Sequence, residues 1–305
     1  MPENNFYKGN IHTHTTESDG DTDPKSVVRW YRQHGYDFLV LSDHNHRTIL
    51  EYSDRERRFK KPLMIPGEEV SVRTGNGTIP IHINGIGISR LVEPIDAEGI
   101  VPTIQANVNA ILEAGGIASI NHPNSGWAFD HKSISQVNGA HLLEVYNGNP
   151  NSNVEGAPGK FSYEEIWDGV LSSRKVIFGA ATDDSHKFQN FDPKLSNPGR
   201  GWIVAQSSEL SINSILNALS SGNFYSSTGV TLSKLHVSKG TISLSIESEH
   251  DYVYTTKFTG RHGIILAEVV GMEAEYNLRG NEGYVRTTVN SSGNHKAWIQ
   301  PIFTK

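Results

Sequence analysis

The chain has 305 residues, with 33 acidic and 27 basic side chains, a formal net charge of −6 and no cysteine. This length suffices for one large α/β domain, with or without a small second one, and the acidic balance without lysine- or arginine-rich runs disfavours a protein that coats nucleic acid or an anionic membrane. Because cysteine is absent, disulfides, thiolate metal sites and a cysteine nucleophile are excluded, and any metal ion must be bound through nitrogen and oxygen.

The N-terminal part of the chain alternates apolar strand-like runs with helix-like segments, which is typical of βα units around a parallel sheet. Asp23-Pro24 begins one helix with an early proline, and Gly115-Gly116 ends another. A tight loop at residues 74–77 precedes a strand. The strand candidates are residues 10–15, 36–42, 62–66, 79–88, 117–120, 141–146 and 176–181. The helix candidates are residues 23–35, 48–60, 103–114, 164–171 and 210–219.

Nearly all of these strands finish in polar residues. In parallel α/β folds the functional site forms at the carboxyl ends of the strands, so these polar ends are expected to meet on one rim. Beyond Gly229 the chain changes to short alternating segments rich in Thr, Ser, Val and Gly, without helical spacing. We therefore predict a catalytic domain over residues 1–229 and a small β domain of unknown role over residues 230–305.

His12 and His14 lie two residues apart on a segment expected to be extended, so their side chains point to the same side of the strand. Neutral imidazole is the commonest metal ligand in proteins, and such a pair can hold one ion. Acidic residues and histidines recur where later apolar runs end. The candidate metal ligands are His12, His14, Asp19, His44, Glu69, His82, His122, Asp184 and His186. Nine nitrogen and oxygen ligands suit zinc, manganese or iron(II) and are too many for one tetrahedral ion, which predicts a multinuclear site.

Each candidate taken alone has a plainer interpretation. Asp19 would by default be a turn aspartate, His82 a buried core histidine and Glu69 a surface carboxylate after a turn. Asp184 and His186, in contrast, repeat the spacing of the opening pair. Their joint placement at strand ends favours a metal site, because unrelated surface residues would show no preference for strand ends.

With these motifs the chain resembles the PHP (polymerase and histidinol phosphatase) family of metal-dependent phosphoesterases. The resemblance is carried by His12-Thr13-His14, Ser18-Asp19-Gly20, Ser42-Asp43-His44-Asn45, Gly67-Glu68-Glu69-Val70-Ser71, His82-Ile83-Asn84-Gly85, Asn121-His122-Pro123 and Asp184-Ser185-His186. It implies a distorted (β/α)₇ TIM-like barrel with a trinuclear metal site, here followed by an all-β segment that many members lack. The implied ligands are His12, His14, Glu69 and Asp184 for the first ion, Glu69, His82 and His122 for the second, and Asp19, His44 and His186 for the third.

Two of these positions have a second carboxylate beside them, Glu68 next to Glu69 and Asp183 next to Asp184. Successive residues of a strand face opposite ways, so only one of each pair can enter the site if the strand is regular there. The Gly-x-Glu and Asp-x-His spacings of the family favour Glu69 and Asp184. The other two would then orient ligands or face away.

The resemblance implies hydrolysis of a phosphate ester, in which two or three divalent ions (manganese, zinc or iron) activate a bridging water and stabilise the charge on the phosphoryl oxygens. Glu69 would bridge two ions. Arg200 is the candidate cationic contact for the substrate phosphate, with Lys187 as a weaker choice. The expected substrate is a small-molecule or nucleotide phosphate. The aromatic side chains that could stack on it are Trp127, Phe129, Tyr146 and Phe188.

Two other classes of protein stay open. Metal-dependent amidohydrolases also begin with His-x-His, although a strand-borne lysine that could bridge metals is not obvious here. A binding protein could use the β segment for recognition and the metal site for structure. No apolar run approaches transmembrane length, and residues 1–9 lack the apolar segment of a secretory signal, so we expect a cytoplasmic protein without membrane contact or stable nucleic-acid binding. A removed leader and any oligomeric state stay open.

Overall fold

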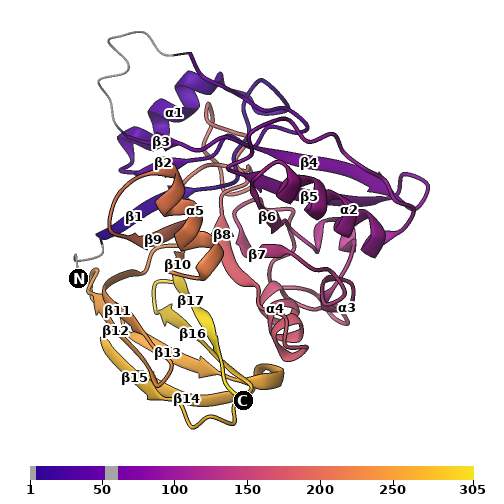
Figure 1. The fold of residues 1–305 in the computed structure, drawn as a ribbon. Helices are drawn as coiled ribbons and strands as arrows, with labels where there is room; N and C mark the ends of the chain where they lie inside the picture. Colours follow the sequence, from indigo (N-terminus) through magenta and orange to yellow (C-terminus); the bar gives the residue numbers. More distant parts are fainter. Residues whose placement is uncertain (1–4, 52–60) are drawn as a thin grey trace.

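The computed structural model describes residues 5–51 and 61–305, and it has mixed α/β architecture (Figure 1). The helices of the described residues are α1 (Pro24–Gln33), α2 (Ile100–Glu113), α3 (His131–Ile134), α4 (Tyr163–Ser172) and α5 (Ile212–Ser221). The strands as far as α5 are β1 (Asn5–Asn10), β2 (Phe38–Leu39), β3 (Leu63–Met64), β4 (Gly67–Thr74), β5 (Ile79–Ile86), β6 (Ile117–Ile120), β7 (Ala140–Asn147), β8 (Phe178–Thr182) and β9 (Trp202–Ser207). The later strands are β10 (Phe224–Ser227), β11 (Thr231–Val237), β12 (Thr241–Glu247), β13 (Tyr254–Thr259), β14 (Ile265–Val270), β15 (Glu273–Asn277), β16 (Tyr284–Ser291) and β17 (Lys296–Phe303).

These strands form three sheets. The largest has the order β14-β13-β16-β17-β10-β9-β1-β2-β3, the second β4-β5-β6-β7-β8 and the third β11-β12-β15. Within the first two sheets, β1-β2-β3 and β6-β7-β8 are parallel, whereas β4, β5 and β6 pair antiparallel. The parallel sheet expected from the βα pattern is therefore present only in part, and the tight loop at residues 74–77 joins the antiparallel pair of β4 and β5. The short turn between β4 and β5 requires an antiparallel pair, because parallel strands need a long crossover.

The α/β class is confirmed, but the described strands do not form one closed barrel sheet. The two large sheets approach each other at two isolated bridges, Thr13 with Ser185 and His44 with Glu69. Each bridge contains or adjoins candidate metal ligands. The predicted site therefore lies where the two sheets meet. The rim argument holds only in part, because Glu69 lies near the start of β4 and His82 in the middle of the antiparallel strand β5.

Local signals account for the helices. The Asp23 side chain accepts a hydrogen bond from the Ser26 amide and begins α1, and Ser162 with Glu165 forms a capping box at α4. Helices α2, α4 and α5 occupy the predicted segments within a few residues. The predicted helix at residues 48–60 lies partly outside the described residues, and its described part, residues 48–51, is not helical. No helix in the described ranges is long and apolar enough to cross a bilayer.

The first strand ends earlier than predicted, at Asn10 rather than at residue 15. The Asn10 side-chain oxygen accepts a hydrogen bond from the His12 amide at 2.8 Å, and this local bond replaces a strand ladder bond. The predicted strand at residues 36–42 is likewise shortened to Phe38–Leu39. Both shortened segments run on into the site, where their backbone departs from regular pairing.

Four of the C-terminal strands, β13, β14, β16 and β17, share the largest sheet with the N-terminal part, because β10 pairs with both β9 and β17 (Figure 1). Arg286 of β16 forms two hydrogen bonds of 2.7 Å with Asp168 of α4, and the Tyr284 hydroxyl donates to the same carboxylate. Tyr284 and Trp298 also belong to the core that packs around α2 and α4. Separate folding of residues 230–305 stays a prediction, and these contacts favour one cooperative unit.

Candidate metal centre

The nine predicted ligands come together in space, from segments that are far apart in the sequence. His12 and His14 follow β1, His44 follows β2, Glu69 and His82 lie within β4 and β5, His122 follows β6, and Asp184 and His186 follow β8. Asp19 lies in the loop after His14, where a Cβ at Gly20 would come within 2.7 Å of the His14 carbonyl oxygen. Glycine thus allows the Asp19 loop to fold back onto the histidine pair.

Glu69 lies at the middle of the cluster and is buried. Its Oε1 is 3.3 Å from His12 Nε2, 3.2 Å from His82 Nδ1 and 3.1 Å from His122 Nε2. Its Oε2 is 2.9 Å from His44 Nδ1 and 3.5 Å from His14 Nε2. One carboxylate therefore contacts five histidines, which is the arrangement expected of a residue shared between ions.

Two aspartates hold the other side of the cluster. Asp184 Oδ1 lies 3.2 Å from both His12 Nε2 and His14 Nε2, and 3.7 Å from His186 Nδ1. Asp19 Oδ1 lies 3.3 Å from His186 Nε2, and its Oδ2 lies 3.6 Å from His44 Nε2. Asp19 is half exposed, whereas Asp184 is buried, so the cluster opens to solvent on the Asp19 side.

Ligand atoms within 4.8 Å of one another define four overlapping groups: His14, Asp19, His44 and His186; His12, His14 and Glu69; His12, His122 and Asp184; and His44, Glu69 and His82. The first group contains the three residues expected at the third ion. The other groups divide the expected first and second sets differently, with His122 grouped with His12 and Asp184, and His44 grouped with His82. Every predicted ligand belongs to at least one group.

Several ligand atoms in the cluster are buried without a hydrogen-bond partner, namely His12 Nε2, His14 Nε2, His82 Nδ1 and Glu69 Oε2. A buried polar atom left unpaired costs about 1–3 kcal/mol. All four atoms point into the same small volume between the strands, since each lies close to another member of the cluster. The donor set and these unpartnered atoms fit divalent metal ions.

The electrostatics of the cluster keep its carboxylates ionised. Burial alone would raise the pKa values of Glu69 and Asp184, but the surrounding histidines, His12 foremost, hold both well below the usual range. Burial, reinforced by His186, lowers the pKa of His14 to about 4. For His44 the carboxylates of Glu69 and Asp19 outweigh burial and raise its pKa to about 10. Ionised carboxylates and a neutral His14 are the states that bind metal.

The two carboxylate doublets are resolved by side-chain direction. Glu68 points away from the cluster and accepts a hydrogen bond from the Val92 amide at 2.7 Å. Asp183 accepts hydrogen bonds from the Tyr31 hydroxyl and from the backbone amides of residues 199, 200 and 201. Asp184 has a left-handed backbone, with φ of 47°, which turns it out of strand register toward His12. The geometry thus favours the choice of Glu69 and Asp184.

A further carboxylate, Glu144 of β7, was missed by the sequence analysis. It is fully buried, and its Oε1 accepts hydrogen bonds from His12 Nδ1 at 2.7 Å and from the Thr182 hydroxyl at 2.5 Å. Its Oε2 accepts from the His122 amide at 2.6 Å and from Asn147 Nδ2 at 2.9 Å. Glu144 therefore fixes the proton of His12 on Nδ1 and leaves Nε2 for a ligand. The sequence contained one indication of a role for Glu144, namely an acidic residue within the apolar run of β7.

Arg200 lies beside the cluster rather than over it. Its Nη1 donates to the Gly148 carbonyl at 2.9 Å, and its Nη2 donates to the Asp192 carbonyl and to Asn197 Oδ1. These contacts join two loops and favour a role different from the predicted phosphate contact. Lys187 is absent from the residues that line the described cavities.

The four predicted aromatic side chains are divided among three places. Tyr146 lines a cavity next to the cluster, whereas Trp127 and Phe129 line a separate cavity. Phe188 packs against Trp30 of α1. Of the four, Tyr146 is therefore placed best to meet a substrate.

No protein-family model matches the chain, and no curated protein matches it significantly. Among solved structures, the chain is similar to a two-domain protein from Bacteroides vulgatus that contains a predicted PHP-like metal-dependent phosphoesterase, with 15% identity and a TM-score of 0.53 over 94% of this chain and 90% of that chain. An amidohydrolase from Chromobacterium violaceum has 16% identity and a TM-score of 0.39 over 62% and 93% of the two chains. The lesion-specific endonuclease EndoQ from Pyrococcus furiosus has 11% identity and a TM-score of 0.42 over 71% and 56%.

The likeness to the Bacteroides protein extends over nearly the whole of both chains and includes the C-terminal strands. It shows that this chain shares the fold of a protein with a predicted PHP-like part, which agrees with the resemblance of the motifs, although the described strands form no closed barrel sheet. At 15% identity it establishes the fold alone, and the TM-scores of the other two structures are too low to support an argument.

Proposed function

We propose that the protein is a PHP-type phosphoesterase that hydrolyses a phosphate ester of a small molecule or nucleotide. Two or three divalent ions, of manganese, zinc or iron, would be held by His12, His14, Asp19, His44, Glu69, His82, His122, Asp184 and His186. The observation that carries the proposal is the convergence of these side chains into one cluster, in which Glu69 contacts five histidines and four buried ligand atoms are left unpartnered. Ions would satisfy these atoms, which otherwise weaken the fold.

When bound, divalent ions lower the pKa of a water toward neutrality and offset the negative charge that builds on phosphoryl oxygens. The side chains of the protein supply the negative charge at the site and the orientation of the candidate ligands. Glu69 offers an ionised carboxylate with both oxygens facing histidines, and Glu144 holds His12 in the tautomer that presents Nε2. The Asn149 side chain lines the same cavity as the cluster and can donate a neutral hydrogen bond to the ester.

We also propose that β1, β2 and β4 to β8 make up the distorted barrel of the family. Supporting this, the two sheets that contain these strands meet through the bridges of Thr13 with Ser185 and His44 with Glu69. In this arrangement the cluster closes the end of the barrel at which only these isolated bridges join the two sheets. The backbone there is free to depart from strand geometry and to place ligands from loops as well as strands.

The test compares manganese stoichiometry and phosphate release for the wild type, Glu69→Gln and Glu68→Gln after identical reconstitution. We expect Glu69→Gln to lose bound metal and to release phosphate at least about a hundredfold more slowly. Glu68→Gln is the matched control, because it removes the charge of the neighbouring buried glutamate that faces away, and we expect it to keep both properties. Full activity of Glu69→Gln would refute the proposal. Bound metal without hydrolysis of any phosphate ester would instead indicate a binding protein.

A further inference from the structure

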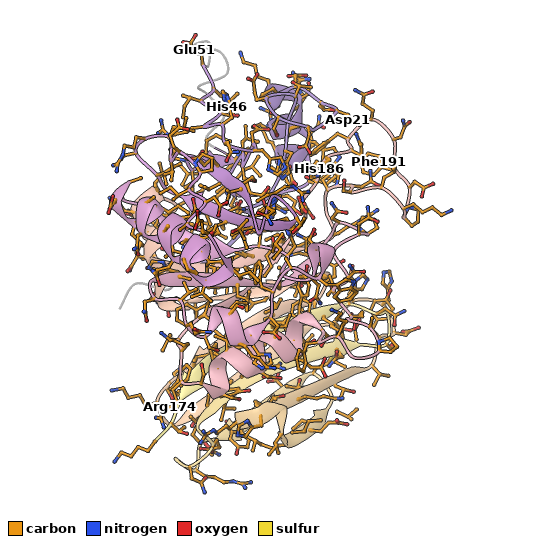
Figure 2. All side chains as sticks on the ribbon, turned by 90° about the vertical axis from the view of Figure 1, so that its right-hand side faces the viewer. Asp21, His46, Glu51, Arg174, His186 and Phe191 are labelled. Atoms are coloured by element: carbon orange, nitrogen blue, oxygen red, sulfur yellow. The ribbon has the colours of Figure 1, made fainter. Side chains whose placement is uncertain are left out.

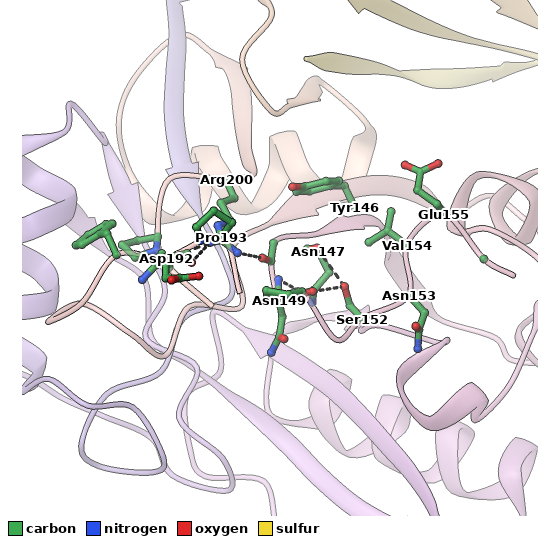
Figure 3. Close-up of a pocket in the computed structure, with 16 residues that line it drawn as sticks. Tyr146, Asn147, Asn149, Ser152, Asn153, Val154, Glu155, Asp192, Pro193 and Arg200 are labelled. Atoms are coloured by element: carbon green, nitrogen blue, oxygen red, sulfur yellow. Dashed lines mark hydrogen bonds between the residues drawn. The ribbon is translucent and has the colours of Figure 1, made fainter. Parts of the chain in front are cut away.

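Two cavities adjoin at the metal centre. The smaller, of about 180 Å³, is lined by six members of the cluster and by Ser125, Asn149, Asn151 and Ser152. The larger, of about 830 Å³, lies between residues 146–156, at the end of β7 and in the loop after it, and residues 191–200 before β9 (Figure 3). Asn149 and Ser152 line both cavities. A molecule can therefore occupy the two cavities together.

The sizes of the cavities suit two parts of one substrate. The smaller cavity is below the range of about 300–1,000 Å³ that is usual for organic ligands, whereas the larger lies within it. Because the metal ligands face the smaller cavity, a phosphoryl group belongs there. The larger cavity is then left for the leaving group of the ester, and it is large enough for a ring system with substituents.

The charges around the larger cavity disfavour an anionic leaving group. Arg200 is the one basic side chain among the described residues that line it, and its guanidinium already donates to three oxygens. The acidic side chains of Glu155 and Asp192 lie on opposite sides of the cavity (Figure 3). Glu155 is 81% exposed, and its Oε1 lies 3.7 Å from Lys296 Nζ, but Lys296 is also paired with Glu164 at 3.3 Å and does not line the cavity. Negative charge without a free cation repels a second phosphate or a carboxylate.

The remaining lining groups combine aromatic rings with neutral amides. Phe191 is 60% exposed, and its ring stacks on Trp30 with centroids 6.4 Å apart, so it is held in place although solvent reaches it. Tyr146 lies across the cavity among asparagines and Ser152 (Figure 3). Phe191 and His186 lie on the same side of the molecule, far from Arg174 (Figure 2). Aromatic faces bind ring faces, and amides bind neutral polar edges.

The asparagine loop also connects the cavity to the metal centre. Asn147 Nδ2 donates to Glu144 and, at 3.2 Å, to Asp184 Oδ2, and Asn149 Nδ2 lies 3.5 Å from the same Asp184 oxygen. Asn149 in turn accepts a hydrogen bond from the Asn151 amide. The position of this loop is thereby set relative to Asp184. A leaving group in the larger cavity would place its ester bond at the cluster.

We propose that the larger cavity is the leaving-group site, and that it selects phosphate esters of uncharged, ring-bearing alcohols or phenols. This inference rests on the proposed phosphoesterase function. Phe191 and Tyr146 would receive the ring, Asn149 and Ser152 the polar groups next to the ester, and Glu155 and Asp192 would reject anionic substituents. Hydrolysis transfers the phosphoryl group to water, and the alcohol or phenol leaves through the open side of this cavity with the proton it gains.

The test uses three phosphate esters: phenyl phosphate, 4-carboxyphenyl phosphate and glycerol phosphate. They present an uncharged ring, the same ring with a negative charge, and no ring. For each ester the kcat/KM of a variant is divided by that of the wild type, which cancels differences in intrinsic reactivity. We expect Phe191→Ala to lower kcat/KM about tenfold for phenyl phosphate and to leave kcat/KM for glycerol phosphate unchanged, because only the ring of phenyl phosphate can pack against the aromatic side chain.

Glu155→Gln should raise kcat/KM for 4-carboxyphenyl phosphate about twofold to fivefold relative to phenyl phosphate, since one exposed charge is removed. Phe161→Ala is the matched control, because Phe161 is an exposed aromatic side chain that lines a different cavity. Phe161→Ala should leave kcat/KM unchanged for all three esters. If Phe191→Ala changes kcat/KM equally for phenyl phosphate and glycerol phosphate, or changes it for neither, the proposal of a leaving-group site is wrong.

Binding of phenyl phosphate to the metal-loaded protein, measured by saturation-transfer NMR, separates this inference from the proposed function. If the wild type hydrolyses none of the esters but binds phenyl phosphate, and Phe191→Ala loses that binding, the phosphoesterase proposal fails and the ring-binding cavity stands. If Phe191→Ala binds phenyl phosphate as well as the wild type, the cavity proposal fails whatever the hydrolysis result.

Discussion

Replacing Glu144 with glutamine tests whether this buried carboxylate determines which nitrogen of His12 is free for metal. Glu144 accepts hydrogen bonds from His12 Nδ1, the Thr182 hydroxyl, the His122 amide and Asn147 Nδ2, at 2.5–2.9 Å. Glutamine has one acceptor oxygen and one NH₂ group in the same volume. It therefore cannot accept from all four donors.

The least costly arrangement places the new NH₂ group where Oε1 was. The Thr182 hydroxyl can rotate to accept a hydrogen bond, whereas the His122 and Asn147 donors cannot. His12 must then accept at Nδ1 and carry its proton on Nε2, the atom that lies 3.3 Å from Glu69 and 3.2 Å from Asp184. A protonated Nε2 cannot bind a metal ion. We expect the affinity of at least one manganese site to fall about tenfold to a hundredfold, or roughly 1.4–2.8 kcal/mol.

Manganese affinity is measured by competition with a fluorescent chelator, and the His12 tautomer by ¹⁵N chemical shifts of the imidazole in the zinc-loaded protein. Glu68→Gln is the control, because Glu68 is also fully buried and lies next to a ligand but contacts none. Unchanged affinity with the proton still on Nδ1 would refute the reasoning. A fall in folding stability alone, with normal affinity per folded molecule, would limit Glu144 to a structural role.

Burial raises the pKa of Glu68 from 4.5 to about 7, so the folded state binds this proton more tightly than the unfolded state. The contribution of this proton to the unfolding free energy is complete below about pH 4.5 and is lost as the pH rises through about 7. The unfolding free energy of the wild type, measured by urea denaturation, should therefore fall by on the order of 2 kcal/mol over this range. Glu68→Gln should abolish this fall. Arg286→Met leaves the buried Asp168 without its ionic partner, with only the Tyr284 hydroxyl as a donor, and should lower the unfolding free energy by about 3–5 kcal/mol. One urea transition for the whole chain would show cooperative folding, whereas two would support a separate domain at residues 230–305. Arg200→Ala should increase amide hydrogen exchange in residues 148–156 and 192–197, which its guanidinium joins; unchanged exchange with a tenfold or larger loss of kcat/KM would instead support the direct phosphate contact.

Much of the candidate site could be predicted from the sequence because its ligands lie in short local motifs. His12 and His14, or Asp184 and His186, need only a two-residue spacing to be recognised, and their position after apolar runs places them at strand ends. The helices followed from local signals as well, such as the Asp23 cap of α1 and the capping box of α4. The resemblance to the PHP family follows from these motifs taken together, and the shared fold with the Bacteroides protein agrees with it.

Glu144 and Arg200 show where local pattern is insufficient. Glu144 stands in an apolar strand, and its partners His12, His122 and Thr182 come from segments 22 to 132 residues away. Arg200 follows the last ligands in sequence, which suggested a contact with phosphate, but its donors are directed to carbonyls of two loops. The hydrogen bonds of a polar side chain depend on its neighbours in space. These neighbours come from distant parts of the chain, so the residue spacing within one segment does not predict them.

The sequence by itself determined the types of the candidate ligands, the position of several of them after apolar runs and the positions of most helices, because these depend on residue chemistry and on the periodicity of one segment. Tertiary structure decided the pairing of β4 with β5, the continuity of the C-terminal strands with β9, and the choice of Asp184 over Asp183. Strand pairing is a contact between distant segments. The direction of Asp184 depends on a left-handed backbone that only its hydrogen-bonded surroundings stabilise.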